Sequence, residues 1–256
     1  RVCALLAETG DVHTKLSSVL AGFPGLWMPL EAVVTRLEEK RMRRAVAVTV
    51  GNRHHGTAKA VDCHLSAQEL SAALQGRGLR VEAPWIDQPG GEPMLQRLRQ
   101  VLASEVRPTD DGFVFCFCGH GDTTELLGND NVRTSYQAIV DAIDTETLRG
   151  KPKLVVFDCC RGNTTSELGQ LRLPKDMILA RSTALTTRAF EQQSIGNVYS
   201  NRLAAAIRSH AAAHSVVDLL KLTQGGVHTL PTPTPQVAHV ELTLGAFHLF
   251  LGDASA

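Results

Sequence analysis

Short apolar runs rich in β-branched residues alternate with amphipathic segments along most of this chain. Continuous apolar runs of this length are typical of buried parallel strands, whereas the segments between them carry leucines at helical spacing. A strand, a helix and a second strand in the same sheet almost always form a right-handed crossover between parallel neighbours. The pattern therefore predicts an α/β fold in which a mostly parallel, six-stranded central sheet has helices on both faces.

The elements can be placed from these patterns. Strands are expected at six apolar runs: 45–51, 79–83, 113–118, 153–160, 177–183 and 247–251. Helices are expected at five amphipathic segments: 66–75, 93–104, 136–143, 198–209 and 215–223. The segment 229–236 contains three prolines, which forbid a helix or an interior strand, so we expect an extended loop there.

Residues 1–44 precede the first expected strand and form an N-terminal helical lead-in or linker in this interpretation. Their leucines and valines follow helical spacing, and the segment closes with the charged run Glu38–Arg44. That run suits either the solvated end of a helix or a protease-sensitive linker.

Charge and cysteine usage exclude several classes of protein. Lys and Arg together number 26, and Asp and Glu also number 26, so the chain lacks the basic excess of a nucleic-acid module or a polybasic membrane anchor. No run of 18 uninterrupted apolar residues indicates a membrane span. The six cysteines do not have the paired spacing of a zinc site. They fit a reducing compartment better than a disulfide scaffold, so we expect the cytoplasm.

Two consecutive strand ends carry chemically reactive side chains. The third expected strand continues into Gly119–His120–Gly121, and the fourth continues through Asp158 to Cys160. Reactive groups of parallel sheets gather at the carboxyl ends of the strands, so a thiol and an imidazole would face one cleft if these strands are neighbours. Such a pair can perform nucleophilic hydrolysis, and N–H groups of the glycine-flanked loop can form an oxyanion hole.

A single buried cysteine is more often a packing residue, and a single histidine after a strand is more often structural. Their joint occurrence at successive strand ends, with glycine on both sides of His120, favours the catalytic interpretation.

Three segments resemble the caspase-like cysteine proteases, the group of caspases, metacaspases and paracaspases. TLRGKPKLVVFDCCRG (147–162) is similar to the strand and signature around the caspase nucleophile, and FCGHGDTTELLGND (117–130) to the segment around the caspase histidine. ILARSTALTTRAFE (178–191) resembles the start of the small-subunit region. The resemblance covers roughly 45–252. It implies a caspase-like three-layer sandwich, with a large-subunit-like region over 45–176 and a small-subunit-like region over 177–256.

The resemblance also implies the site residues. His120 matches the catalytic histidine, Cys160 matches the nucleophile, and Gly121 with the backbone N–H of Cys160 matches the oxyanion hole. Cys159 stands where caspases have alanine. We expect its side chain to point to the opposite face, because neighbouring residues of a strand alternate. The pattern requires no third catalytic group.

Specificity depends on the pocket for the residue before the scissile bond, called P1. Asp158 stands where caspases carry a pocket glutamine, and Glu191 lies at or near the position of a pocket arginine. Metacaspases and paracaspases carry an acid at the Asp158 position and cleave after Arg or Lys. A carboxylate attracts a guanidinium and repels an acidic P1 side chain, so this resemblance favours a basic P1 residue.

Other interpretations of this pocket stay open. Arg188 stands where paracaspases have a further pocket glutamate, and it could pair with Asp158 or Glu191 and so favour an acidic P1 residue. The pocket aspartate of metacaspases is matched by Ser66, and Asp62 lies one turn earlier. Asp158 could also be a structural cap at its strand end. The remaining alternative is a weakly active signalling scaffold with the caspase fold, against which the intact His120–Cys160 pair argues.

The resemblance implies polypeptide substrates, a zymogen and a role in cell death. No nucleic-acid or membrane partner is expected, because the charges balance and no apolar run is long enough to span a membrane. Autoprocessing could occur within Lys40–Arg44 or within 163–176, and a homodimer could form through the last strand, 247–251, unless N-terminal helices cover it. No cofactor is expected. Activation by calcium stays an alternative, although the nearby acids are scattered and lack EF-hand spacing: Asp87, Asp110 and Asp111.

Overall fold

The structure of the chain, a computed structural model, is described for part of its length. The described residues are 40–53, 62–159, 171–183, 189, 191–192, 196–228, 236, 238–243 and 249–252. Packing divides the chain into two compact units, Arg1–Glu39 and Lys40–Ala256, and all described residues belong to the second. The helical lead-in predicted for the start of the chain thus lies outside the described residues as far as Glu39.

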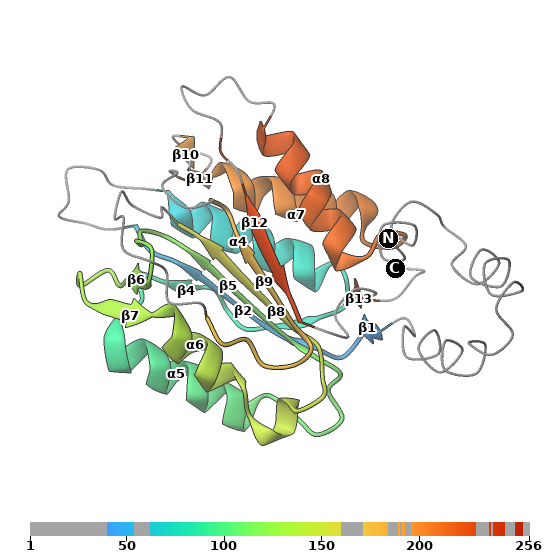
Figure 1. Cartoon of the computed structure of the whole chain (residues 1–256), viewed down its shortest axis with the longest axis horizontal. Coiled ribbons are helices and arrows are strands. Elements are labelled where there is room, and N and C mark those ends of the chain that lie inside the picture. The colour runs from blue at the N-terminus through green and yellow to red at the C-terminus, as the bar shows by residue number, and fades with distance from the viewer. Residues whose placement is uncertain are drawn as a thin grey trace, which may run out of the picture. The chain divides into compact units, whose positions relative to one another are not determined.

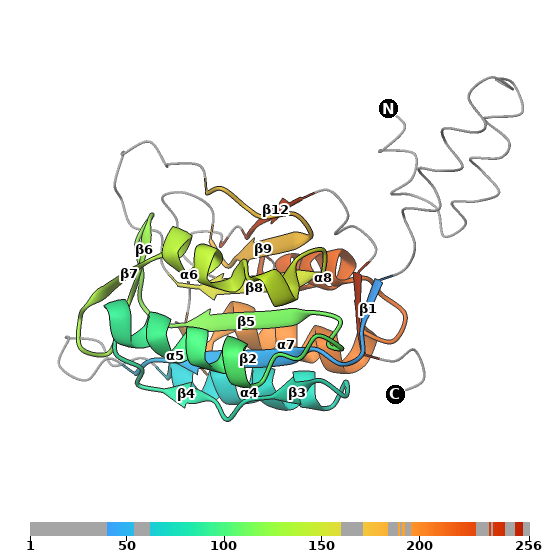
Figure 2. The same cartoon turned by 90° about the horizontal axis from the view of Figure 1, so that it is seen from below.

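A mostly parallel sheet forms the centre of the second unit. Its strands are β2 (Val46–Gly51), β3 (Arg80–Val81), β4 (Trp85–Ile86), β5 (Phe113–Cys118), β8 (Lys153–Asp158), β9 (Met177–Arg181) and β12 (His239–Leu242). The spatial order is β12-β9-β8-β5-β2-β3, and β4 also pairs with β2 (Figure 2). Of these pairings only β12 with β9 is antiparallel. The predicted mostly parallel sheet is confirmed.

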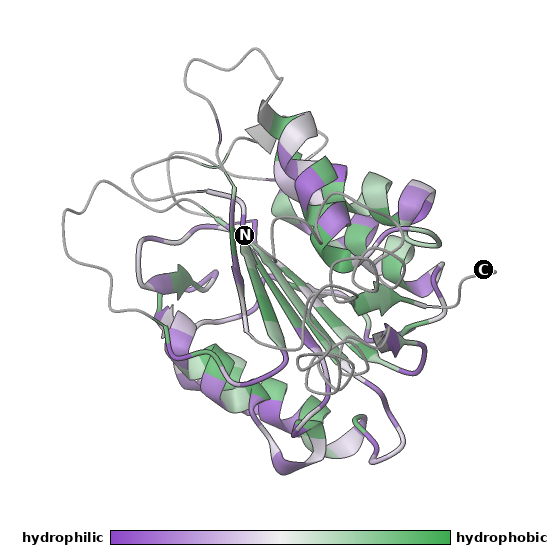
Figure 3. Cartoon of the chain, turned by 45° about the vertical axis from the view of Figure 1, so that its right-hand side comes forward, coloured by the Kyte–Doolittle hydropathy of each residue, from purple (hydrophilic) through white to green (hydrophobic). Residues whose placement is uncertain are grey.

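Helices cover both faces of this sheet, as predicted. Figure 1 shows α4 (Cys63–Gln75), α7 (Val198–His210) and α8 (Val216–His228) on one face, with α5 (Gly91–Ser104) and α6 (Tyr136–Ile143) on the other. Side chains alternate along each strand and so divide between two cores. The phenylalanines of β5 pack on the α5–α6 side, and its valine and cysteines pack on the α4–α7–α8 side. Figure 3 shows the strands as a hydrophobic band between these helices. The result is a three-layer sandwich.

The boundaries agree closely for the long elements. The strand predicted at 113–118 and the helix predicted at 136–143 have the predicted bounds, whereas β8 ends at Asp158 and β9 ends at Arg181, each two residues early. Helices α4, α5, α7 and α8 occupy the predicted segments with somewhat longer bounds. Of the proline-rich loop at 229–236, only Gln236 is described.

The prediction of a sixth sheet strand at 247–251 is wrong. Its described part, β13 (Leu249–Leu251), pairs in parallel with β1 (Lys40–Met42) in a separate two-stranded sheet. One edge of the central sheet is β12, which the sequence pattern did not indicate. His239 is exposed and Glu241 is partly exposed, so β12 lacks a continuous apolar run. The segment considered as a dimer edge is therefore not an edge of the central sheet.

The backbone of the charged run at the start of this unit forms hydrogen bonds with two distant segments. Met42 is fully buried, and its carbonyl accepts a bond from the N–H of Gly252 at 2.9 Å. The N–H groups of Arg43 and Arg44 donate to the carboxylate of Asp111 at 3.1 and 3.0 Å. A cut within Lys40–Arg44 would require these bonds to open, because a protease binds its substrate as an accessible extended chain.

Candidate active site

The two strand ends singled out by the sequence lie next to each other. β5 and β8 are parallel neighbours, and Cys118 pairs with Asp158 at the end of the register. The N–H of Gly119 donates to the carbonyl of Asp158 at 3.1 Å. His120 and Cys159 therefore follow the same edge of the sheet, as the prediction requires. Cys160 lies outside the described residues.

His120 begins a tight loop that leads into the hairpin of β6 (Glu125–Leu127) and β7 (Arg133–Ser135). The carbonyl of His120 accepts a bond from the N–H of Leu127, and the N–H of Asp122 donates to the carbonyl of Glu125, both at 2.9 Å. Gly121 lies between these bonds in an isolated bridge with Leu126, and neither bond uses its own N–H. This leaves the Gly121 N–H outside the pairing, as an oxyanion donor requires.

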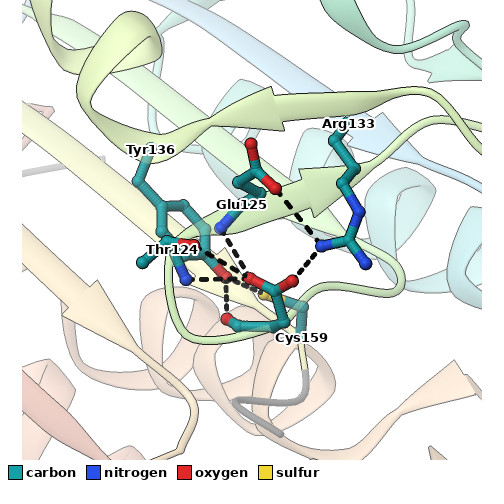
Figure 4. Close-up of polar contacts among 6 residues, drawn as sticks. Thr124, Glu125, Arg133, Tyr136 and Cys159 are labelled. Atoms are coloured by element: carbon teal, nitrogen blue, oxygen red, sulfur yellow. Dashed lines mark hydrogen bonds and ion pairs between the residues drawn. The ribbon is translucent and has the colours of Figure 1, made fainter. Parts of the chain in front are cut away.

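The half-buried imidazole of His120 lines a pocket formed largely by this hairpin. Its lining residues are His120, Gly121, Asp122, Glu125, Leu126, Leu127 and Arg133. The guanidinium of Arg133 bonds the carboxylate of Asp122 and lies 3.2 Å from an oxygen of Glu125 (Figure 4). Partial burial opposes ionisation of Asp122, but the N–H of Thr124 and the Arg133 guanidinium keep its pKa below the ordinary value. The wall beside His120 thus holds two carboxylates and one cation.

Cys159 packs beneath the His120 loop. It is buried, and its Sγ lies 3.1 Å from the hydroxyl oxygen of Tyr136 (Figure 4). A Cβ on Gly121 would lie only 2.9 Å from this sulfur. Cys159 therefore belongs to the core on the α5–α6 side, and the neighbouring Asp158 faces the other layer. Tyr136 was missed by sequence reasoning, because an aromatic residue in a short apolar helix carries no sign of such a contact.

Asp158 is fully buried and holds the start of α7. Its Oδ2 accepts bonds from the N–H of Ser200 at 2.9 Å and from the Ser200 hydroxyl at 2.6 Å. A carboxylate is favoured at a helix N-terminus, where backbone N–H groups are free to donate. Burial nevertheless raises the pKa of Asp158. Asp158 therefore has the structural role at its strand end that the sequence left open. Its other oxygen, Oδ1, makes no hydrogen bond to the described residues.

One further polar residue, Asn197, lies beside Asp158, and the sequence did not single it out. Asn197 precedes α7 and donates from Nδ2 to the backbone carbonyl of Asp158 at 3.3 Å. Its own N–H donates to the hydroxyl of Ser66, the residue that matches the pocket aspartate of metacaspases, at 2.7 Å. Asn before a helix is a capping signal, which could have indicated a helix boundary but not this partner.

The other predicted pocket residues are only partly described. Asp62 lies at the N-cap position of α4, and its carbonyl accepts a bond from the N–H of Leu65. The backbone of Glu191 lies in β10 (Glu191–Gln192), which pairs with β11 (Gly196–Asn197) and places Glu191 opposite Asn197. The Glu191 side chain and all of Arg188 lie outside the described residues.

Cys116 and Cys118 of β5 are buried free thiols. Burial raises the pKa of Cys116 to about 12 and that of Cys118 well above its ordinary value. Because the thiolate is the reactive form, neither of these two is a nucleophile near neutral pH.

The acids considered for calcium have other partners. Asp87 pairs with Arg53 and Asp110 pairs with Arg80, whereas Asp111 bonds backbone N–H groups. Among the described residues, no group of three or more His, Cys, Asp or Glu side chains could hold a metal ion. Within the same ranges, no helix combines the length and apolar character needed to cross a membrane.

Comparison with known proteins connects this geometry to a family. The model of the caspase domain matches residues 44–244, which include both strand ends and the helices around them. The chain belongs to the caspase-domain family. Among solved structures, caspase-1 from Spodoptera frugiperda is similar with a TM-score of 0.66 and 17% identity, over 85% of this chain and 92% of that one. This likeness shows the caspase fold. No curated protein matches the chain significantly.

Membership in the caspase-domain family makes the chain a cysteine-protease domain that acts on polypeptides. The matched region runs from before β2 to the end of β12, so it includes every strand of the central sheet.

Proposed function

We propose that this chain is a cysteine endopeptidase in which His120 and Cys160 form a catalytic dyad. The observation that carries the proposal is the register of β5 with β8, which brings His120 and Cys159 to one edge of the sheet. Cys160 follows Cys159 in the sequence, and the proposal is that its thiol meets the imidazole at this edge. The Cys159 thiol itself is buried against Tyr136, so the role of nucleophile falls to Cys160.

The reaction follows from these groups. The Cys160 thiolate attacks the scissile carbonyl, and His120, which has taken the thiol proton, protonates the leaving amine. The N–H of Gly121 and the N–H of Cys160 bind the oxyanion that forms in each tetrahedral intermediate. A water molecule then attacks the acyl-enzyme, with His120 as general base, and restores the free thiol.

We further propose that P1 is basic. Asp158 lies two positions before the proposed nucleophile, and its two bonds from Ser200 both go to Oδ2. Oδ1 faces the neutral side chains of Ser182 and Asn197, which offset the cost of its burial only in part. A buried carboxylate whose ionisation is opposed by burial gains most from a cation beside it. An arginine guanidinium can pair with such an oxygen and neutralise the charge, whereas an acidic side chain would be repelled.

The test is hydrolysis of fluorogenic tetrapeptides that differ only in having Arg, Lys or Asp at P1. Wild type, Cys160→Ala and His120→Ala are compared, each with calcium and with a chelator. We expect cleavage after Arg and Lys that both variants lose. Cleavage after Asp would overturn the specificity, and equal cleavage by Cys160→Ala would overturn the dyad. The calcium and chelator arms show whether calcium activates the enzyme.

The free thiols also bear on location. Cys116 and Cys118 are free thiols, and a thiolate nucleophile requires a reduced cysteine. We therefore propose a reducing compartment, namely the cytoplasm. Fractionation of cells that express the chain, probed with an antibody, checks this location.

A further inference from the structure

Tyr136 links the two segments that carry the catalytic residues. It is the first residue of α6, and its side chain is 1% exposed. Its ring packs on Phe157 of β8 with 4.7 Å between the ring centroids. Its hydroxyl donates to the backbone carbonyl of Asp122 at 2.8 Å and lies 3.1 Å from Sγ of Cys159 (Figure 4). One side chain therefore contacts the histidine loop and the residue before the proposed nucleophile.

The Tyr136 hydroxyl and the Cys159 thiol leave no space for a larger side chain at Gly121. A Cβ at this position would lie 3.0 Å from the Tyr136 hydroxyl oxygen and 2.9 Å from the Cys159 sulfur. Gly121 thus rests directly on the hydroxyl and the thiol, and glycine is the residue that fits there. A shift of the Tyr136 hydroxyl would change the support of Gly121, whose N–H is the proposed oxyanion donor.

The Tyr136 ring also lies close to the guanidinium of Arg181. The guanidinium carbon of Arg181 lies 5.6 Å from the ring centroid, within range of a cation–π interaction. Arg181 is buried, and its guanidinium lies 3.4 Å from Glu241 on the edge strand β12. Burial and the neighbouring Cys159 raise the pKa of Tyr136 well above its ordinary value. The hydroxyl accordingly stays protonated and can donate throughout the working pH range.

We propose that Tyr136 is a positioning residue whose hydroxyl, by donating to the Asp122 carbonyl, holds His120 and the Gly121 N–H in place relative to the end of β8. The inference rests on the proposed dyad and extends it. Tyr136 acts through the loop, by its bond to the backbone carbonyl of Asp122. A phenylalanine would retain the packing on Phe157, so the hydroxyl is the group that carries the role.

The chain provides a matched control, because its two tyrosines are both fully buried. The hydroxyl of Tyr199, on α7, has no hydrogen-bond partner among the described residues. Tyr136→Phe and Tyr199→Phe therefore make the same chemical change at sites that differ in the bond to the loop. Both are measured in the full chain, with kcat expressed per folded molecule so that unfolded protein does not count.

For Tyr136→Phe we expect kcat to fall about tenfold, with KM within about twofold, because misplaced catalytic groups affect the transition state more than substrate binding. Tyr199→Phe should keep the wild-type kcat. The pH profile of iodoacetamide alkylation, followed at the Cys160 peptide by mass spectrometry, should shift in Tyr136→Phe only. A purely structural role would lower Tm and leave both kcat and this profile unchanged, and that result would overturn the proposal.

A double variant separates the two contacts of the hydroxyl. If the bond to Asp122 carries the effect, Tyr136→Phe should lower kcat by the same factor in a Cys159→Ala background. Loss of the effect in that background would assign it to the sulfur contact and refute the proposed bond. Failure of the dyad itself is recognised separately, because it appears as equal activity of wild type and Cys160→Ala. The alkylation profile tests Tyr136 even then.

Discussion

The N–H of Gly119 donates to the carbonyl of Asp158 across 3.1 Å, so β5 and β8 stay paired up to the residues that precede the site. This bond places the histidine loop beside the end of the cysteine strand. Asp158, the last residue of the register, and Cys159, the residue after it, face opposite layers, because Asp158 points to α7 and Cys159 points to Tyr136. The neighbouring contacts lead to five predictions.

Cys159 and Cys160 should respond differently to replacement by alanine. Cys160→Ala should abolish peptide hydrolysis, because it removes the proposed nucleophile. Cys159→Ala should keep most of the activity and cost about 1 kcal/mol of unfolding free energy, since it removes a small buried side chain. Peptide kinetics with urea unfolding measures both. Loss of turnover in Cys159→Ala alone would show that the nucleophile is Cys159.

Gly121→Ala should impair the site through steric conflict. The new Cβ would lie 2.9 Å from the Cys159 sulfur and 2.9 Å from the carbonyl oxygen of Glu125, so the loop must shift. We expect kcat to fall at least tenfold, as loss of an oxyanion donor costs about 100-fold or more. Adding Cys159→Ala removes one of the close contacts and should restore part of kcat. A Gly121→Ala enzyme with wild-type kcat would contradict the close packing.

Asp158→Asn should lower the preference for basic P1 residues. The amide keeps an oxygen that can accept from Ser200 but loses the negative charge that attracts a guanidinium. The ratio of kcat/KM for Arg to that for an uncharged P1 residue should fall, whereas cleavage of the uncharged peptide should change little. An unchanged ratio would refute the role of Asp158 in specificity.

The same substitution should change how stability depends on pH. Burial raises the pKa of folded Asp158 above the ordinary value of 3.8, so the folded state binds the proton more tightly than the unfolded state. The stabilising contribution of Asp158 is therefore complete below about pH 3.8 and is lost as pH rises through the folded-state pKa. The unfolding free energy of wild type relative to Asp158→Asn should fall across this window. Urea unfolding at several pH values measures it, and a rise would contradict the raised pKa.

Ser200→Ala tests the attachment of β8 to α7. It removes the shorter of the two bonds to Asp158 and leaves a buried carboxylate with less compensation. We expect a loss of about 1–3 kcal/mol in unfolding free energy, the range for a buried group that loses its partner. Thr223→Val, on α8, is the comparison, because its hydroxyl bonds only the Leu219 carbonyl within its own helix. A smaller loss for Ser200→Ala than for Thr223→Val would contradict the prediction.

Local patterns were sufficient for the inner strands of the sheet and for the strand end that carries His120. The apolar runs at 113–118 and 153–158 are buried on both faces, so their composition alone shows them as strands. The glycines around His120 mark the point where the first of these strands ends. The resemblance then assigned His120 and Cys160, and the structure describes the first of these two.

Other features depended on contacts that no local pattern contains. β12 is partly exposed, and its sequence resembles that of a loop. Leu249 and Leu251 are apolar like residues of a central strand, but they complete the core on the α4–α7–α8 side and pair with β1. Tyr136 lies 23 residues before Cys159, and Ser200 lies 42 residues after Asp158. Which side chain meets which across such separations depends on the order in which strands and helices pack. The sequence alone determined the alternating elements and the strand ends. The tertiary structure decided the sheet edge and the residues that support the site, because hydrophobic periodicity is local and side-chain partnership is not.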